Sequence, residues 1–203
     1  MPSPSPSAPP AAAVNHYENF PVASWLCPPR LRPPIAAIYH FARTADDIAD
    51  EGDARPEARI AELQAYRADL GAAARGARPS ARWPQVFGPL ARAIADFGLP
   101  EALLANLLDA FMQDIAWTRD GRAYADRAEL LDYCRRSANP VGRLLLHLYG
   151  EQRPDALAQS DAICSALQLI NFWQDVSIDL PRGRFYLPLA DCAAHGLARQ
   201  DFK

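Results

Sequence analysis

Residues 35–51, IAAIYHFARTADDIADE, indicate the fold class of this chain. Four charged residues share one helical face at the spacing i, i+3, i+4, i+7: Arg43, Asp46, Asp47 and Asp50. The rest of the segment is apolar around most of its circumference, so we expect a buried helix whose acids face an interior. Like charges four residues apart oppose helix formation by roughly 0.2–0.5 kcal/mol per pair, and burial strengthens the repulsion. Arg43 cannot balance this group alone, so the segment needs further cations.

Helical spacing continues through the rest of the chain, where apolar residues recur at steps of three and four and alternating β-branched runs are scarce. Proline and glycine mark the boundaries. We predict an all-α bundle with helices over these approximate ranges: 18–26, 35–51, 56–75, 83–97, 100–118, 126–149 and 154–180. Asp126 and Glu129 form a variant capping box. Asn139–Gly142, NPVG, should kink or interrupt its helix, because proline removes a backbone donor.

A second polar stripe lies in residues 167–179, LQLINFWQDVSID. Asn171, Asp175 and Asp179 repeat at i, i+4, i+8 among large apolar neighbours, so on a helix they share an inward face. One acidic stretch alone is most often a solvated helix face. Two acidic stripes are a more specific signal of a functional site than one. Each stripe is costly to bury without a partner, and shared cations with a bound anion would stabilise both.

Magnesium fits this pattern, because it prefers carboxylate oxygens together with water and substrate phosphates, and Mn²⁺ is the alternative. We predict that the metal ligands are Asp46, Asp47, Asp50, Asn171, Asp175 and Asp179. Metal ions bridging a diphosphate neutralise the charge that develops as its carbon–oxygen bond breaks. A dry apolar cavity would protect the resulting carbocation. Arg184 and Tyr186, which follow the second stripe, are predicted to bind phosphate oxygens.

The composition excludes several other classes of function. The chain has 203 residues and a formal net charge of -3 with its charges dispersed, so no basic patch for nucleic acid is expected. Its four histidines show no metal-binding spacing, and its isolated glycines form no nucleotide cradle, so no nicotinamide is predicted. Phe111, Trp117, Phe172 and Trp173 are expected mostly in the core, where their ring faces could also line a cavity.

Domain organisation and location follow from similar observations. Residues 1–13 are rich in proline, serine and alanine and are expected to be a disordered tail, with one helical domain over residues 14–203. The four cysteines are widely spaced without a CxxC pair, which favours a reducing cytosol. No stretch of about 18 uncharged apolar residues occurs, so no membrane span is predicted.

These motifs resemble those of the squalene/phytoene synthase family, whose members carry two Asp-rich helical motifs in an isoprenoid-synthase bundle around a central cavity. Residues 46–50, DDIAD, resemble the first motif, and residues 171–179, NFWQDVSID, resemble the second. Arg43 matches the basic residue before the first motif, which implies a diphosphate-binding role shared with the Arg-x-Tyr of Arg184 and Tyr186. Further matches imply that the catalytic residues are Tyr133, in the family's Tyr-rich segment, with Asp46, Asp50 and Asp175.

Residues 15–24, NHYENFPVAS, resemble the family's bacterial hopanoid-pathway branch. This implies ionisation of presqualene diphosphate, capture of the rearranged cation by water and release of diphosphate, giving hydroxysqualene. Two alternatives stay open: condensation of two prenyl diphosphates, such as farnesyl diphosphate, to presqualene diphosphate or phytoene, and a non-catalytic helical partner of another isoprenoid enzyme. A lipid-soluble product implies transient contact with the cytoplasmic face of a membrane. The sequence leaves the oligomeric state open.

The resemblance covers about residues 15–190. Family members usually continue for several more helices, so we expect a C-terminally truncated domain. In the segment around Tyr133 the usual Ala-Gly-x-Val-Gly stands as Ala138-Asn139-Pro140-Val141-Gly142, a departure at its second position.

Overall fold

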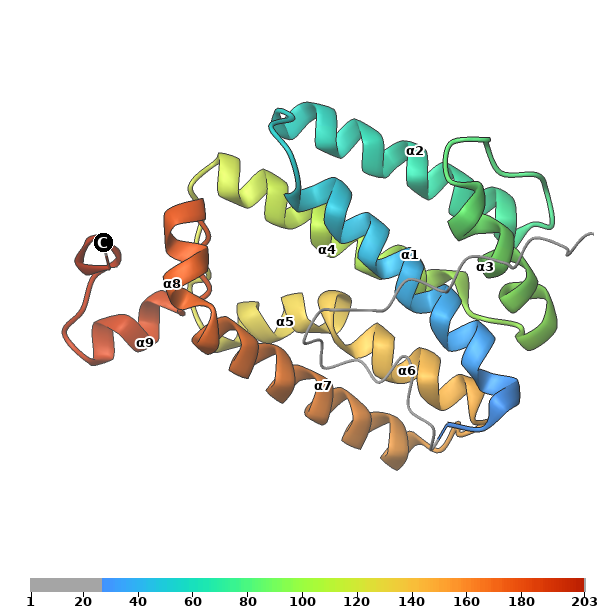
Figure 1. The fold of residues 1–203 in the computed structure, drawn as a ribbon. Coiled ribbons are helices and arrows are strands. Elements are labelled where there is room, and N and C mark those ends of the chain that lie inside the picture. Colours follow the sequence, from blue (N-terminus) through green and yellow to red (C-terminus); the bar gives the residue numbers. More distant parts are fainter. Residues whose placement is uncertain (1–26, 203) are drawn as a thin grey trace, which may run out of the picture.

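The computed structural model describes residues 27–202, and this part of the chain contains helices and no strands (Figure 1). The predicted disordered tail, the predicted helix over 18–26 and the 15–24 segment lie outside the described residues. The elements are η1 (Pro29–Leu31), α1 (Arg32–Asp50), α2 (Pro56–Ala74), α3 (Pro84–Phe97), α4 (Glu101–Arg119), α5 (Arg127–Ser137), α6 (Asn139–Leu148), α7 (Pro154–Gln174), α8 (Val176–Asp179), η2 (Leu180–Arg182), α9 (Leu189–Ala194) and η3 (Arg199–Asp201). The all-α prediction is therefore confirmed.

Helix boundaries lie where proline, glycine and capping residues predict them. Prolines occupy the first positions of α2, α3 and α7, where a missing N–H costs no hydrogen bond. Gly98, with φ 62°, ends α3 in the left-handed conformation that glycine adopts readily. At the start of α5 the Asp126 carboxylate accepts from the Glu129 amide at 2.9 Å, and the Glu129 carboxylate accepts from the Ala125 amide at 2.7 Å. The N-cap at Asp126 is thus confirmed, whereas the return bond of Glu129 goes to Ala125, one residue before the N-cap, rather than to Asp126.

The structure confirms the predicted helix interruption near Asn139–Gly142 and shows that the predicted single helix over 154–180 is wrong. The predicted interruption near Asn139–Gly142 separates α5 from α6 at Ala138, which has φ -122° and ψ -50°. The predicted single helix over 154–180 instead ends at Gln174, and α8 begins after Asp175. Residues 175–179, DVSID, all have modest helix propensity, which explains the break. The short α9 and η3 were not predicted, because such short elements leave no periodic signal.

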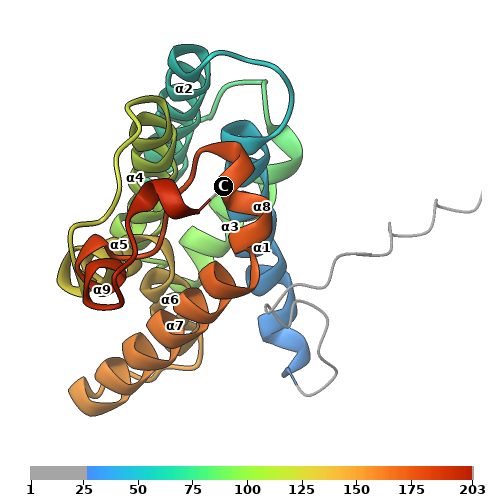
Figure 2. The same ribbon diagram turned by 90° about the vertical axis from the view of Figure 1, so that its left-hand side faces the viewer.

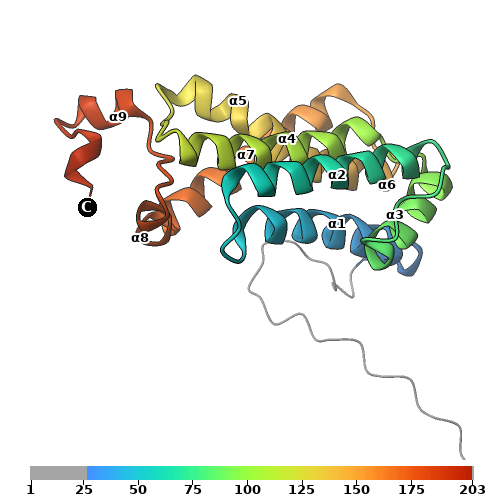
Figure 3. The same ribbon diagram turned by 90° about the horizontal axis from the view of Figure 1, so that it is seen from above.

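The helices form two groups with α4 between them. On one side α1, α2 and α3 pack against one another, and on the other side α5 and α6 pack against each other and against α7. The α4 helix contacts members of both groups. Figures 1 and 2 show α2 and α7 on opposite sides of the bundle, and Figure 3 shows α9 extending past one end of it. None of the described helices has the length and apolar character needed to cross a membrane.

The main core fills the group of α1, α2, α3 and α4. Phe41, Tyr66 and Phe87 lie at its centre with 1% exposure or less, and the Phe41 and Tyr66 rings stack at 5.1 Å. The Tyr66 hydroxyl donates to the Phe41 carbonyl at 3.1 Å, which satisfies a buried polar group and ties α2 to α1. A smaller cluster of Ala110, Tyr124, Leu130, Tyr133 and Phe172 lies on the other side of α4. All four cysteines are free thiols.

Close packing of α6 on α7 depends on Gly142 and Asn139. A Cβ atom at Gly142 would lie 2.4 Å from Ser160 Oγ and 2.6 Å from Cys164 Sγ, so any larger residue would require these two side chains to shift. The buried Asn139 Oδ1 accepts from the Ser165 hydroxyl at 2.9 Å. The asparagine that departs from the usual motif therefore has a partner on α7.

Candidate active site

A cavity of about 790 Å³ lies between the two helix groups and is lined from α1, α4, α5, α6, α7, α8 and the segment that follows η2. Its charged and amide lining residues include Asp46, Asp50, Asp114, Asn171, Asp175, Asp179 and Arg184. Asp46 and Asp50 of the first stripe and all three residues of the second stripe thus face one cavity. The roles of the individual residues stay predictions.

Arg184 connects the first stripe to the segment that follows the second. Its guanidinium donates two hydrogen bonds to the Asp50 carboxylate, one of them at 2.8 Å to Oδ2. This fork-to-fork pair spans 134 positions of sequence, and both side chains are mostly buried, with 17% and 22% exposure. A diphosphate that binds Arg184 would therefore share this guanidinium with Asp50.

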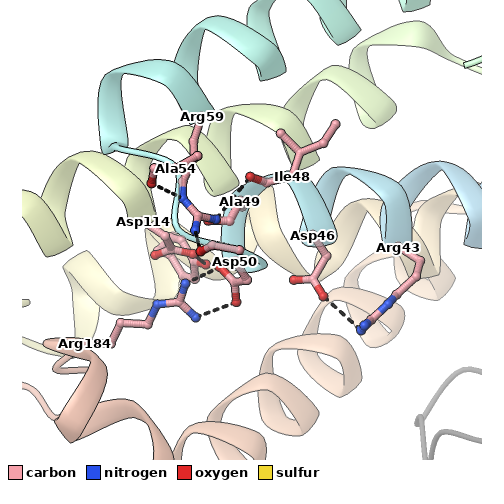
Figure 4. A network of polar contacts seen from close by, with 11 residues as sticks. Arg43, Asp46, Ile48, Ala49, Asp50, Ala54, Arg59, Asp114 and Arg184 are labelled. Atoms are coloured by element: carbon pink, nitrogen blue, oxygen red, sulfur yellow. Dashed lines mark hydrogen bonds and ion pairs between the residues drawn. The ribbon is translucent and has the colours of Figure 1, made fainter. Parts of the chain in front are cut away.

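A second arginine holds the end of α1 from outside the cavity lining (Figure 4). Arg59 of α2 donates to the carbonyls of Ile48, Ala49, Gly52 and Ala54, with the Ile48 bond at 3.3 Å and the Ala54 bond at 2.9 Å. The last carbonyls of a helix lack intrahelical partners and form the negative end of its dipole. Arg59 satisfies them and places a positive charge beside the acids. It thereby fixes the turn that carries Asp50.

Arg43 and Asp47 lie beside the cavity rather than in its lining. Arg43 pairs with Asp46 at 3.1 Å, with Asp47 at 2.9 Å and with Glu51 at 3.3 Å. It lines an adjoining pocket of about 240 Å³ that shares Asp46, Phe111 and Val141 with the cavity. Arg43 is therefore placed to approach an anion at the cavity edge, whereas the structure does not bring Asp47 into the lining.

The second stripe keeps one face across the helix break. The Asp175 amide donates to the Asn171 carbonyl at 2.9 Å, and the Asp179 amide donates to the Asp175 carbonyl at 2.8 Å. These i, i+4 bonds preserve the helical phase through Asp175, so all three side chains line the cavity. This wall is more open than expected, because Asp175 is exposed. Trp173 is also 59% exposed, which corrects the expectation that it is buried.

The crowded carboxylates alter the acidity of the site. Burial first, and repulsion from Asp50 next, raise the pKa of Asp46 to about 6 despite the nearby Arg43. Burial also raises the pKa of Asp179, with repulsion from Asp175 acting in the same direction. Among the lining residues the five aspartates 46, 50, 114, 175 and 179 face one cation, Arg184. The cavity therefore has unbalanced negative charge that favours cation binding.

The donor set suits a hard divalent cation that arrives with its own oxygen ligands. Among residues 27–202, no group of three or more His, Cys, Asp or Glu side chains could hold a metal ion. This excludes a closed protein cage of those residues in the described part. Mg²⁺ does not require such a cage, because it keeps several waters and binds through one or two carboxylates plus substrate phosphates. Asp46 and Asp50 on one side, and Asn171, Asp175 and Asp179 on the other, fit such open coordination.

Aromatic rings form the wall nearest the predicted catalytic tyrosine. Tyr133 lines the cavity at 4% exposure, and its ring lies 6.1 Å from those of Phe172 and Tyr186. The Phe172 and Tyr186 rings stack at 3.9 Å. Trp117 lies outside this lining, against Tyr124 at 4.7 Å, whereas Phe111 lines the cavity. The site thus combines an acidic end with aromatic faces that attract cations.

Asp114 of α4 is a cavity residue that the motif analysis missed. The Tyr133 hydroxyl donates to its Oδ2 atom, and burial raises the pKa of Asp114 to about 7. A signal was present in the sequence, because Asp114 follows Leu107, Ala110 and Phe111 at seven, four and three residues. It therefore stands on an apolar helix face, where a lone acid requires a partner.

Comparisons with known proteins agree with this geometry. The family model "Squalene/phytoene synthase" matches residues 13–203. The chain is 40% identical to the hydroxysqualene synthase of Rhodopseudomonas palustris, covering 91% of this chain and 59% of the relative. It is 35% identical to the presqualene diphosphate synthase of the same organism, covering 92% of this chain and 63% of the relative.

A solved structure shows the same fold. The squalene synthase HpnC from Alicyclobacillus acidocaldarius superposes with a TM-score of 0.77 at 38% identity, covering 92% of this chain and 67% of that chain. The chain thus spans about three fifths of the length of the two curated relatives, at 59% and 63%. The matched family model covers every residue that the structure describes. This chain belongs to the squalene/phytoene synthase family.

Proposed function

We propose that this chain is a Mg²⁺-dependent enzyme that ionises presqualene diphosphate and forms hydroxysqualene with release of diphosphate. The observation that carries the proposal is the meeting of both acidic stripes and Arg184 in one cavity that also has an aromatic wall. Diphosphate departure needs charge neutralisation at one end of a site and protection of a carbocation at the other. The cavity offers both.

The acidic end of the cavity would hold the leaving group. Asp46 and Asp50 from α1, with Asn171, Asp175 and Asp179 from the other wall, are the candidate ligands. Mg²⁺, or Mn²⁺ in its place, supplies Lewis-acid neutralisation of the diphosphate oxygens when bound. Arg184 and Tyr186 line the same end and would donate to those oxygens. Arg43 would act from the neighbouring pocket.

The apolar end would hold the prenyl chains and the cation. Phe111, Val141 and Leu167 line it with apolar side chains. The stacked rings of Phe172 and Tyr186 offer faces that stabilise positive charge. Tyr133, whose ring lies 6.1 Å from each of these two rings, is the candidate catalytic residue.

The choice of presqualene diphosphate as substrate has separate support. The chain is more similar to a hydroxysqualene synthase than to a presqualene diphosphate synthase of the same organism. The test is to incubate purified protein and Mg²⁺ with presqualene diphosphate or farnesyl diphosphate and analyse the products. Hydroxysqualene from presqualene diphosphate alone supports the proposal. Presqualene diphosphate formed from farnesyl diphosphate, or phytoene formed from a longer prenyl diphosphate, would show a condensing activity instead.

One observation favours a second candidate function, a non-catalytic helical partner of another isoprenoid enzyme. Among the described residues, α7 exposes Ile163, Leu167, Ile170 and Trp173, and an apolar face of this kind can bind a partner protein. Failure to release diphosphate from any prenyl diphosphate, with diphosphate release restored only by adding a second isoprenoid enzyme, would support this function. Retention of every acid in both stripes argues for catalysis.

We further propose that the protein acts in the cytoplasm and docks transiently on the membrane that receives its lipid-soluble product. Co-sedimentation with liposomes tests this. The protein should pellet with liposomes and stay in the supernatant without them, and a supernatant fraction unchanged by lipid would contradict it.

A further inference from the structure

Asp114 lines the cavity but belongs to neither acidic stripe. It projects from α4, the helix between the two groups, and accepts a hydrogen bond from the Tyr133 hydroxyl of α5. Both residues line the cavity. Figure 4 shows Asp114 beside the paired side chains of Asp50 and Arg184. The Asp114–Tyr133 pair therefore stands between the acidic end of the site and its aromatic wall.

The direction of this hydrogen bond determines what Tyr133 can do. A hydroxyl has one proton, so a tyrosine that donates it to a carboxylate can only accept at its remaining positions. Burial raises the pKa of Tyr133 well above its usual value, so the phenol keeps its proton and donates it to the Asp114 carboxylate. A group that approaches the Tyr133 oxygen from the cavity consequently meets an acceptor.

The rings around Tyr133 leave the hydroxyl proton as its one adjustable part. Its ring is within 5.7 Å of the Tyr124 ring and within 6.1 Å of the Phe172 and Tyr186 rings. Packing at this density fixes the ring plane. The hydroxyl hydrogen could still rotate toward the cavity if Asp114 did not hold it. Asp114 thus decides whether Tyr133 presents a donor or an acceptor.

We propose that Asp114 is a positioning residue that acts through Tyr133, holding the hydroxyl proton so that the tyrosine oxygen can accept the proton released when the carbocation is resolved. This inference rests on the proposed function. As the oxygen of water bonds to the cationic carbon, one of its O–H bonds breaks and the proton passes to the Tyr133 oxygen. The Tyr133 hydroxyl proton passes to Asp114 Oδ2, and the O–H electron pair stays on the product oxygen. By this stage diphosphate has already left with the electron pair of the broken carbon–oxygen bond.

Kinetics of Asp114→Asn, Tyr133→Phe and the double variant test this role with presqualene diphosphate and Mg²⁺. General-base assistance contributes roughly 10²-fold or more. We therefore expect each single variant to lower kcat by about 10²-fold with KM within about twofold, because the residues act after substrate binding. The double variant should be no slower than either single variant, since both remove the same step.

The control is Asp109→Asn. Asp109 lies on the same helix, pairs with Arg67 of α2 and is outside the cavity lining, so kcat should stay at the wild-type value. If Asp114→Asn does not fold by circular dichroism, Asp114→Glu takes its place, because it keeps the charge and displaces the acceptor. Two results would overturn the inference while the proposed function stands. One is an unchanged kcat in the Asp114 variant, and the other is a decrease of kcat in the double variant equal to the product of the two single decreases. An inactive wild type would refute both.

Discussion

The helices α1 and α7 carry the two halves of the same candidate site but are held in very different ways. Seven residues of α1 are buried, and the helix packs against α2, α3 and α4. In α7, which is longer, Phe172 is the one buried residue, and Ile163, Leu167, Ile170 and Trp173 are exposed. A rigid half that carries Asp46 and Asp50 therefore faces an open half that carries Asn171 and Asp175.

This contrast shows how one residue pattern can have two structural outcomes. In both helices polar residues stand among large apolar ones, which indicates burial. For α1 the neighbouring helices supply the packing, and Arg59 and Tyr66 add hydrogen bonds to its backbone. For α7 the described residues leave one apolar side uncovered. Apolar periodicity identifies a face that can be buried but does not identify what covers it.

The largest expected effect tests the difference between α1 and α7 through the free energy of unfolding. Phe41→Ala should lower the free energy of unfolding by about 3–5 kcal/mol, because Phe41 is fully buried on α1 and its removal leaves a cavity. Trp173→Ala on α7 should change it by about 0.5 kcal/mol or less, because that side chain is largely exposed. Urea denaturation followed by circular dichroism measures both. Equal losses would show that α7 is packed as tightly as α1.

The next effect concerns diphosphate release, to which the α1 half and the α7 half of the site should contribute equally. Asp50→Asn and Asp175→Asn should each reduce Mg²⁺-dependent diphosphate release by roughly 10²- to 10³-fold while the helical fold is kept. Asp161→Asn is the matched control, because Asp161 lies on α7, pairs with Arg143 and is outside the cavity lining. A phosphate-release assay at saturating Mg²⁺ measures the three variants. Wild-type turnover in both Asp50→Asn and Asp175→Asn would exclude their metal role.

A smaller effect distinguishes the hydrogen bonds that Arg59 makes to the end of α1 from the other contacts of α2. Arg59→Gln should destabilise the protein by about 1–2 kcal/mol, because carbonyls at the end of α1 lose charge-assisted hydrogen bonds. It should also raise the Mg²⁺ concentration needed for half-maximal activity, because the turn with Asp50 loosens. Arg67→Gln is the control, since Arg67 bonds α4 through the Ala105 carbonyl and Asp109. An identical Mg²⁺ requirement in both variants would contradict a special role for Arg59.

The smallest effect is a pH dependence that arises at Asp114. Its pKa is raised to about 7 in the folded protein by burial, above the usual 3.8, so the folded state binds more protons than the unfolded state between these values. Its contribution is fully present below pH 3.8 and is lost as pH rises through about 7. Metal-free wild type should therefore lose about 1 kcal/mol of stability relative to Asp114→Asn between pH 6 and 8. Urea midpoints in EDTA measure this, and parallel curves would contradict it.

Much of the fold and part of the site could be predicted from the sequence for local physical reasons. The bounds of α1 and α3 follow from proline and glycine, which act within a few residues. The convergence of Asp46 and Asp50 with Asn171 and Asp175 follows from helical spacing together with the cost of burying acids.

Other features depend on contacts that no local pattern encodes. The break at Asp175 results from several modest propensities rather than from one strong breaker. The Arg184–Asp50 pair joins residues 134 positions apart. Asp114 is a single acid with no repeating partner, so its role appears only when Tyr133 is seen to donate to it.

Crystals grown with MnCl₂ and inorganic diphosphate offer the most direct test that opposing carboxylates jointly bind metal and diphosphate. Anomalous difference maps locate Mn²⁺, a substitute for Mg²⁺, without reference to activity. We expect peaks between Asp46 and Asp50 on one wall and Asn171 and Asp175 on the other, with diphosphate density reaching Arg184. Diphosphate bound elsewhere, or Mn²⁺ absent from between these two walls, would contradict the account.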